Sequence, residues 1–177
     1  GMNVGTVAAG RIGLAALRRL KPFDVKLHYT DKHRLPESVE KELSLTFHLN
    51  VESLVKVCDV VTINAPLHPE TEHMFNDKLI SMMKRGSYIV NTARGPLIDE
   101  PALLAALDSK QVGGAALDVV TTEPLAKDSP LLGRDNVIVS PHTGFYSIEA
   151  LEELQTKCAA DVARVLSGEK AVYPISA

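Results

Sequence analysis

The sequence is poor in cysteine and has no long hydrophobic run. Its two cysteines, Cys58 and Cys158, are too few and too far apart for a disulfide framework, and each lies in an apolar stretch that predicts a buried free thiol. No apolar run approaches the roughly 20 residues that span a bilayer, and the chain opens in a strand-like segment rather than in a signal peptide. We therefore expect a cytoplasmic protein in a reducing compartment, without a membrane segment.

Charge of one sign is not in excess either. The chain has 19 basic and 22 acidic residues, which are interspersed, and a formal net charge of −3. This balance predicts no nucleic-acid partner and no anionic membrane surface. Hydrophobic residues make up 45% and charged residues 23%, which is typical of a globular protein. Because no repeat, low-complexity tract or linker divides the 177 residues, we expect a single domain over 1–177.

Strand-like and helix-like segments alternate along the whole chain. The predicted strands are 3–8, 25–30, 45–49, 59–65, 87–93, 112–120 and 136–141. The predicted helices are 11–21, 36–43, 51–57, 76–84, 99–108 and 147–166. In the first helix, the residues expected to face inward are Ile12, Leu14, Ala15 and Leu17. The alternation requires right-handed crossovers, so it predicts an α/β fold with a doubly wound parallel sheet between two helix layers (three-layer αβα).

A glycine-rich loop, "AAGRIG", follows the first predicted strand. It matches the G-x-G-x-x-G fingerprint of Rossmann-type dinucleotide-binding loops, with Ala8, Gly10 and Gly13 in the three glycine slots. Gly10 would let a pyrophosphate approach the backbone and Gly13 would let the helix pack closely on the loop, whereas Ala8 is expected to adopt a negative φ at little cost. The amide groups of the helix N-terminus, together with Arg11, are expected to bind the phosphates.

An acidic residue ends the second predicted strand. Asp31 stands 18 residues after Gly13, where the fingerprint has the acid that binds the ribose 2′-hydroxyl. A carboxylate there repels a 2′-phosphate, so NAD is expected rather than NADP, although Lys32, His33 and Arg34 add basic groups beside it. The alternative is that the loop is a plain turn and that Asp31 is a solvated strand end.

Ligands of such sheets bind beyond the C-terminal ends of the strands, so the residues that follow the strands are the candidate site residues. The candidate cofactor-binding residues are Ala9, Gly10, Arg11, Ile12, Asp31, Lys32, Pro66, His68, Thr92, Ala93, Arg94, Asp118, His142 and Gly144. The remaining histidines, His28, His33, His48 and His73, are expected to be structural or surface groups. His68 and His73 do not have a zinc-ligand spacing, and no metal site is expected.

Five stretches together resemble the D-2-hydroxyacid dehydrogenase family, including its formate dehydrogenase branch. They read "GTVAAGRIG", "APLHPETEHMFN", "VNTARGPLIDEPAL", "GGAALDVVTTEPL" and "VIVSPHTGFYS", and the resemblance extends over essentially all of the chain. It implies an NAD-binding domain with Arg94, Glu123 and His142 at the catalytic positions. It also implies that Asp118 holds the nicotinamide and that Pro66 and His68 line the path between adenosine and nicotinamide.

The chemistry of these residues agrees with reduction of a 2-keto acid. Arg94 can form a bidentate pair with a carboxylate, and His142 can donate a proton to a carbonyl oxygen near neutral pH. Glu123 can orient the imidazole through its other nitrogen, and Asp118 can hold the nicotinamide amide. Taken singly, each has an ordinary alternative: a surface arginine, two turn acids beside Pro124, and a strand-end histidine.

The two halves of the chain resemble different branches of the family. The first half is similar to formate dehydrogenase, whereas Glu123-Pro124 and the Thr143-Gly144-Phe145 sequence that follows His142 are similar to general 2-hydroxyacid or phosphoglycerate-type dehydrogenases. The family also implies an N-terminal substrate domain that these residues lack. We therefore expect NAD binding with little turnover in isolation, on a 2-keto acid, 2-hydroxy acid or formate. The resemblance also implies a helix before the first strand, which these residues lack, and dimer contacts on this domain. We therefore expect an exposed apolar surface and a homodimer, or self-association, through it.

Two other functions stay open at this point. One is a non-catalytic NAD(H)-binding module that senses redox state or acts through partners. The other is a domain built as a minimal scaffold, with which the Gly1-Met2 start and the mixed halves are compatible. The Arg94, Glu123 and His142 set favours the dehydrogenase, because a pure binding module needs no such trio.

Overall fold

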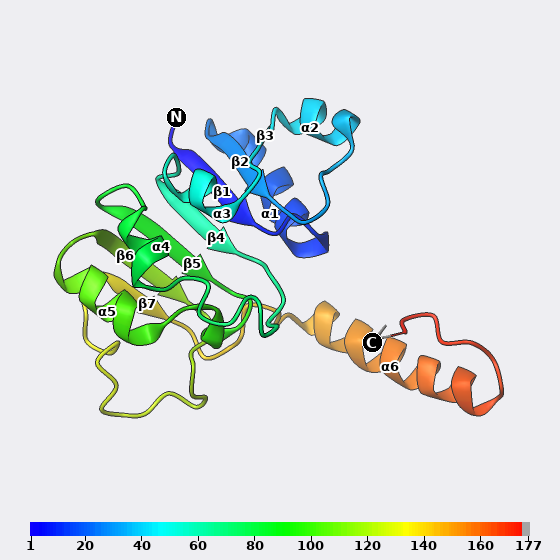
Figure 1. Ribbon diagram of the computed structural model, residues 1–177. Coiled ribbons are helices and arrows are strands. Elements are labelled where there is room, and N and C mark those ends of the chain that lie inside the picture. Colours follow the sequence, from blue (N-terminus) through cyan, green and yellow to red (C-terminus); the bar gives the residue numbers. More distant parts are fainter. Residues whose placement is uncertain (175–177) are drawn as a thin grey trace. The chain divides into compact units, whose positions relative to one another are not determined.

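A parallel sheet forms the centre of residues 1–142 (Figure 1). The computed structural model describes residues 1–174. The strands are β1 (Asn3–Val7), β2 (Lys26–Thr30), β3 (Thr46–Phe47), β4 (Val60–Ile63), β5 (Ser87–Asn91), β6 (Val112–Leu117) and β7 (Val137–Val139). Their order is β3-β2-β1-β4-β5-β6-β7, and all neighbouring pairs are parallel. The order reverses between β1 and β4, as in a doubly wound Rossmann-type sheet, so the predicted fold class is confirmed.

The helices alternate with the strands along the chain, as the sequence pattern predicts. They are α1 (Arg11–Leu20), α2 (Glu37–Leu43), α3 (Val51–Val55), α4 (Asp77–Ser81), α5 (Glu100–Asp108) and α6 (Ile148–Leu166), with the short 3-10 helices η1 (Lys21–Phe23) and η2 (Gly95–Leu97). Most elements are shorter than expected, and β3 is reduced to Thr46–Phe47. The strand ends at Phe47, and after the His48 N–H has donated to Tyr29 O the chain turns away from β2 toward Asn50. The Asn50 side chain caps α3 by accepting a hydrogen bond from the Ser53 N–H at 2.9 Å.

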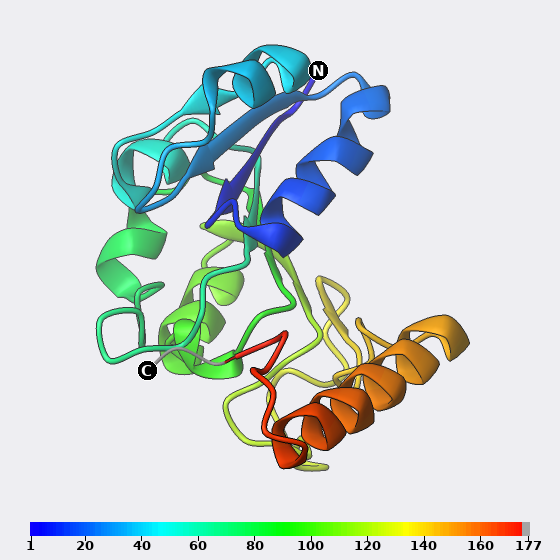
Figure 2. The same cartoon turned by 90° about the vertical axis from the view of Figure 1, so that its right-hand side faces the viewer.

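Helices cover both faces of the sheet. One core cluster joins Leu54 of α3, Ile80 of α4 and Leu103 of α5 to the strands, whereas a second joins Leu17 of α1 and Leu43 of α2 to β1 and β2. Figure 2 shows α1 on one side of the strands and α4 and α5 on the other. This is the predicted three-layer arrangement, with helices on both faces of the sheet.

Helices α1 and α2 cover their face of the sheet only around β1 and β2, and the part of that face over β5–β7 is exposed. The strand register shows which residues of β5–β7 lie on that face. Val4, which packs in the core cluster with Leu17 of α1, pairs with Val60, and Val60 pairs with Tyr88. The same face therefore carries Tyr88, Val90, Ala116 and Ile138. Tyr88 is 47% and Ile138 is 70% exposed. An apolar sheet surface is therefore available over β5–β7.

Two predicted burials are wrong. Ile12 is 69% exposed, because α1 meets the sheet through Gly13 and Leu17, and Ile12 lies at the helix start on a different side. Cys58 is buried as predicted, but Cys158 is exposed, since α6 has no buried residue.

The described chain divides into two compact units. The first is Gly1–His142, which contains the whole sheet, and the second begins at Thr143 and contains α6. In the second unit, Ser147 caps α6 by accepting a hydrogen bond from the Ala150 N–H at 3.0 Å. The prediction that residues 1–177 form one domain stays a prediction.

Candidate functional site

The loop between β1 and α1 has a strained first position. Ala8 has φ +70°, so the prediction of a negative φ is wrong. Two hydrogen bonds hold it there: its N–H donates to Thr30 O at 2.9 Å, and its carbonyl oxygen accepts from Thr6 Oγ1 at 2.8 Å. Left-handed backbone costs a residue with a Cβ roughly 1–2 kcal/mol, which explains why the fingerprint has glycine in this slot.

Replacing Ala8 with glycine is expected to stabilise the chain. The substitution relieves the left-handed strain of roughly 1–2 kcal/mol, and the added freedom of glycine in the unfolded chain offsets about half of it. The free energy of unfolding should rise by up to about 1 kcal/mol in a urea titration, with unchanged NADH affinity. A fall in stability would show that the two backbone hydrogen bonds of Ala8 depend on its Cβ.

The other two loop glycines have distinct surroundings. A Cβ on Gly13 would lie 2.2 Å from the carbonyl oxygen of Ala8, so only glycine lets α1 approach the loop this closely. A Cβ on Gly10 would meet nothing within 4 Å, because Gly10 faces open space. Gly10 is also the N-cap of α1, where no side chain caps the helix and the first turn has no acidic residue. The start of α1 therefore presents backbone N–H groups to an anion, as phosphate binding requires.

Asp31 lies beside this loop and is part of its support. One carboxylate oxygen accepts a hydrogen bond from the Ala9 N–H at 2.7 Å, and the other accepts from the His33 N–H at 2.8 Å. The carboxylate thus joins the end of β2 to the glycine loop across the sheet edge. Each oxygen has two acceptor positions, so the group can hold the loop and also accept from a ribose hydroxyl.

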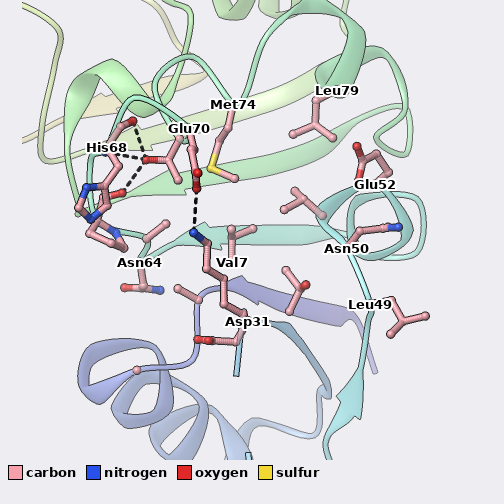
Figure 3. Close-up of a pocket in the computed structure, with 18 of the residues that line it drawn as sticks. Val7, Asp31, Leu49, Asn50, Glu52, Asn64, His68, Glu70, Met74 and Leu79 are labelled. Atoms are coloured by element: carbon pink, nitrogen blue, oxygen red, sulfur yellow. Dashed lines mark hydrogen bonds and ion pairs between the residues drawn. The ribbon is translucent and has the colours of Figure 1, made fainter. Parts of the chain in front are cut away.

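A cleft of about 750 Å³ opens beside the loop, at the C-terminal ends of β1, β2 and β4. The predicted residues that line it are Gly10, Asp31, Lys32, Pro66 and His68. Figure 3 shows Asp31 on one wall and the segment with His68 and Glu70 on the opposite wall. The volume is within the range of small-molecule sites. Gly10, the uncapped start of α1 and the carboxylate of Asp31 all border this cleft, so its residues fit a dinucleotide.

Two of the three basic residues that follow Asp31, Lys32 and Arg34, are paired with acids. Lys32 Nζ lies 2.8 Å from Glu70 Oε2 across the cleft (Figure 3), and Arg34 makes two 2.9 Å hydrogen bonds to the carboxylate of Glu40. Neither acid is singled out by the sequence: Glu70 lies within the "APLHPETEHMFN" stretch, and Glu40 lies outside every family-like stretch. Their pairing leaves Asp31 as the charged group that dominates this wall.

A second group of polar residues follows β6 and β7. His142 Nδ1 lies 2.7 Å from Glu123 Oε2, and the other carboxylate oxygen accepts from the Val120 N–H at 3.1 Å. His142 has φ +55°, and its N–H donates to Asp118 O at 2.8 Å. Backbone strain of this kind is concentrated at active sites, where the surrounding structure enforces it. Glu123 and His142 thus form the oriented carboxylate–imidazole pair that sequence reasoning expects.

Two polar residues that sequence reasoning missed position their neighbours. Asn91 is fully buried at the end of β5; its side chain accepts from the Ala93 N–H at 3.0 Å and donates to Arg94 O at 2.9 Å. Ser140 Oγ donates to Asp118 Oδ1 at 2.5 Å. The signal that could have identified them is a polar side chain at or just after the C-terminal end of an apolar strand. Arg94 is exposed, and its Nη1 donates to Ala93 O at 2.7 Å.

The pair formed by Glu123 and His142 predicts a pH dependence of stability. Hydrogen bonds from His142 and from the Val120 N–H lower the pKa of Glu123 below its ordinary value of 4.5. A carboxyl group with a lowered folded-state pKa stabilises the fold above its ordinary pKa, and that contribution disappears as the pH falls through the lowered value. Glu123→Gln should thus cost at most about 1 kcal/mol near pH 6, since the pair is exposed, and less as the pH falls to 3. Urea titrations at both pH values check this; an equal cost at both would contradict it.

The structure brings most predicted residues to one edge of the sheet but not into one cavity. Ala9, Arg11 and Ile12 lie in or after the glycine loop, and Arg11 and Ile12 are exposed. Thr92, Ala93, Arg94, Asp118 and His142 follow β5, β6 and β7, outside the lining of the cleft. Gly144 belongs to the unit that begins at Thr143.

Neither a metal-binding cluster nor a membrane-spanning helix is found in the part of the chain that the structure describes. No group of three or more His, Cys, Asp or Glu side chains there is arranged to hold a metal ion. Among the helices of residues 1–174, none combines the length and the apolar character that a membrane span needs.

Known proteins share both sequence and fold with the chain. A family model described as "D-isomer specific 2-hydroxyacid dehydrogenase, NAD binding domain" matches residues 1–144. Formate dehydrogenase of Pseudomonas sp. (strain 101) is 55% identical over 165 residues, which are 93% of this chain and 40% of the relative. Glyoxylate reductase of Thermofilum pendens is 40% identical over 171 residues, 96% of this chain and 50% of the relative.

Solved structures agree with this similarity. A formate dehydrogenase of Granulicella m. superposes with a TM-score of 0.92 at 44% identity, over 97% of this chain and 46% of that one. The holo form of D-mandelate dehydrogenase from Rhodotorula graminis superposes with a TM-score of 0.94 at 31% identity, over 100% of this chain and 52% of that one. The chain thus spans about half the length of the relatives that it matches.

Proposed function

The chain belongs to the D-isomer specific 2-hydroxyacid dehydrogenase family as its NAD-binding domain, and from this membership we propose that it supplies both the cofactor cleft and the catalytic side chains for hydride transfer on a 2-keto or 2-hydroxy acid. The observation that supports the catalytic part is the 2.7 Å contact between His142 Nδ1 and Glu123 Oε2. An imidazole oriented through Nδ1 in this way would act on the substrate through Nε2, as an acid or base.

The residues of the cleft would hold the cofactor. The N–H groups at the start of α1, next to Gly10, face the pyrophosphate, and Asp31 accepts from the adenosine ribose. Pro66 and His68 line the path along the opposite wall, and Asp118, fixed by Ser140, holds the carboxamide of the nicotinamide. When bound, the nicotinamide supplies or accepts the hydride.

The catalytic side chains would act on the substrate in three ways. Arg94 binds the substrate carboxylate through its guanidinium fork, on a loop that the buried Asn91 fixes. His142 donates the proton from Nε2 to the carbonyl oxygen as this oxygen gains negative charge, and takes it back in the reverse direction. Glu123 accepts from Nδ1–H, orients the ring and stabilises its protonated form.

A single-turnover assay tests this proposal on the 177-residue chain. NADH oxidation is measured with protein in excess over NADH and with glyoxylate, pyruvate or hydroxypyruvate. We expect slow oxidation that His142→Asn abolishes without changing NADH affinity. His73→Asn is the matched control, because His73 also has a left-handed backbone (φ +50°) but lies outside the site. Equal rates in both variants would refute the role of His142, and fast multiple turnover by the chain alone would refute the need for a substrate domain.

Formate oxidation is the second candidate reaction, because the Pseudomonas formate dehydrogenase is 55% identical to the chain. Formate oxidation involves no proton transfer to a carbonyl oxygen, so a glutamate that orients the histidine has no role in it. In the same assay, formate and NAD replace the keto acid and NADH. NAD reduction that Glu123→Gln leaves unchanged would favour formate; activity with keto acids alone, lost in Glu123→Gln, would favour the 2-keto acid.

The exposed sheet surface at Tyr88 and Ile138 supports self-association as a further part of the proposal. Side chains that are 47% and 70% exposed on one sheet face form an apolar surface that a second copy of the chain would cover. Ile138→Asp is expected to shift the chain from dimer to monomer in light scattering after size exclusion. A wild-type chain that is already monomeric would contradict this part.

A further inference from the structure

Two histidines outside the cleft face each other near the edge of the sheet. His28 is the central residue of β2, and His48 directly follows β3. His28 Nδ1 lies 3.0 Å from His48 Nε2, and their ring centroids are 5.2 Å apart. Both side chains are half-buried, so the pair is held by the fold yet reachable from solvent.

A chain of hydrogen bonds fixes the orientation of His28. Asn3 Nδ2 donates to Asp59 Oδ2 at 3.2 Å, and Asp59 also pairs with the ammonium group of Lys84. The carboxylate only accepts, so the amide oxygen of Asn3 is the atom that faces the imidazole, and it lies 3.1 Å from His28 Nε2. His28 therefore carries its proton on Nε2 and directs the lone pair of Nδ1 toward His48.

This arrangement is the one that ligating histidines use in metal sites. A histidine that binds a metal nearly always donates its other ring N–H to a carbonyl or carboxylate oxygen, which fixes both the tautomer and the orientation of the ring. The Asn3 and Asp59 side chains provide that support for His28 before any ion is present.

We propose that His28 Nδ1 and His48 Nε2 bind one divalent transition-metal ion, Ni²⁺ or Cu²⁺, with water as the remaining ligands. With metal–nitrogen bonds of roughly 2.0–2.1 Å, nitrogens 3.0 Å apart subtend about 95° at the metal. That angle is close to the roughly 90° of tetragonal or octahedral sites, which Ni²⁺ and Cu²⁺ adopt, and below the roughly 109° of a tetrahedral zinc site.

The proton balance of this binding is simple. In the pair without metal, His48 Nε2–H donates to His28 Nδ1, because His28 Nδ1 has no proton. On binding, both rings turn so that the lone pairs of the two facing nitrogens converge on the ion. The Nε2 proton of His48 leaves and its Nδ1 gains one through water, so both rings stay neutral and both facing nitrogens become ligands. The ion would then join β2 to the segment that leads to Asn50 and α3.

Nickel titration of the 177-residue chain tests the proposal. Calorimetry should detect one site, and His28→Asn and His48→Asn should each lower its affinity at least tenfold. Asn3→Ala keeps both ligands but removes the support of His28, and should lower the affinity about tenfold. His73→Asn, the control, should bind like the wild type. A wild-type chain without a nickel site, or unchanged affinity in His48→Asn, would overturn the proposal.

A measurement on the wild type alone covers the case in which a variant fails to fold. Paramagnetic Ni²⁺ should broaden the ring NMR signals of His28 and His48 before those of the other four histidines. Broadening that begins at another histidine would overturn the proposal. The test needs no NAD and no turnover, so its outcome is independent of the proposed function.

Discussion

Replacing Gly13 with alanine is expected to destabilise the chain by about 3 kcal/mol or more, which is the upper range for an overpacked core position. The added Cβ would lie 2.2 Å from the carbonyl oxygen of Ala8 and 3.1 Å from Thr6 Oγ1. Neither neighbour can move easily, because Thr6 Oγ1 donates to that same carbonyl oxygen and the Ala8 N–H donates to Thr30. Either α1 must move away from the sheet, or the loop must lose the hydrogen bonds that Ala8 makes with Thr6 and Thr30.

Thermal unfolding measures this effect. A cost of about 3 kcal/mol lowers the midpoint by about 10 °C in a chain of this size. Gly10→Ala is the matched control, since it adds the same methyl group three positions earlier, where nothing lies within 4 Å. A Gly13→Ala chain that melts within a degree or two of the wild type would show that α1 does not pack on the loop as described.

Gly10→Ala is expected to have the opposite profile, with little change in stability and a large loss of NADH affinity. Gly10 has φ −66°, which alanine adopts freely, so the substitution costs less than about 1 kcal/mol at this N-cap. The methyl group would extend into the space next to the start of α1, which the pyrophosphate needs. We expect NADH affinity to fall at least tenfold, which corresponds to about 1.4 kcal/mol.

Fluorescence titration with NADH checks this second prediction. Ala8→Gly serves as a reference, because it changes the same loop without adding an atom. Unchanged affinity in Gly10→Ala would place the phosphates elsewhere, and an equal loss in Ala8→Gly would indicate a general effect on the loop.

The order of elements and the edge that carries the site could be predicted from the sequence. Apolar strands alternate with helices that have a period of 3.6 residues, and this alternation specifies a parallel sheet whose strands end at one edge. Asp31 and His142 each follow such a strand, so their position at that edge follows from local pattern alone.

Features that depend on distant contacts could not be predicted. The positive φ of Ala8 results from its hydrogen bond to Thr30 on the neighbouring strand. The pairing of His28 with His48 depends on the register between β2 and β3, which links residues 20 positions apart. The exposure of Ile12 follows from the close approach that Gly13 allows. In each case tertiary packing sets the backbone angle, the side-chain contact or the exposure of the residue, and the local sequence alone does not.

Binding of NAD(H) in the cleft beside the glycine loop is tested most directly by an NMR titration of the ¹⁵N-labelled wild-type chain with NADH. We expect saturable shifts of the Ala9 to Gly13 amides, of His33, whose amide donates to Asp31, and of the segment from His68 to Thr71 on the opposite wall. An absence of saturable binding, or shifts confined to residues away from this cleft, would contradict it.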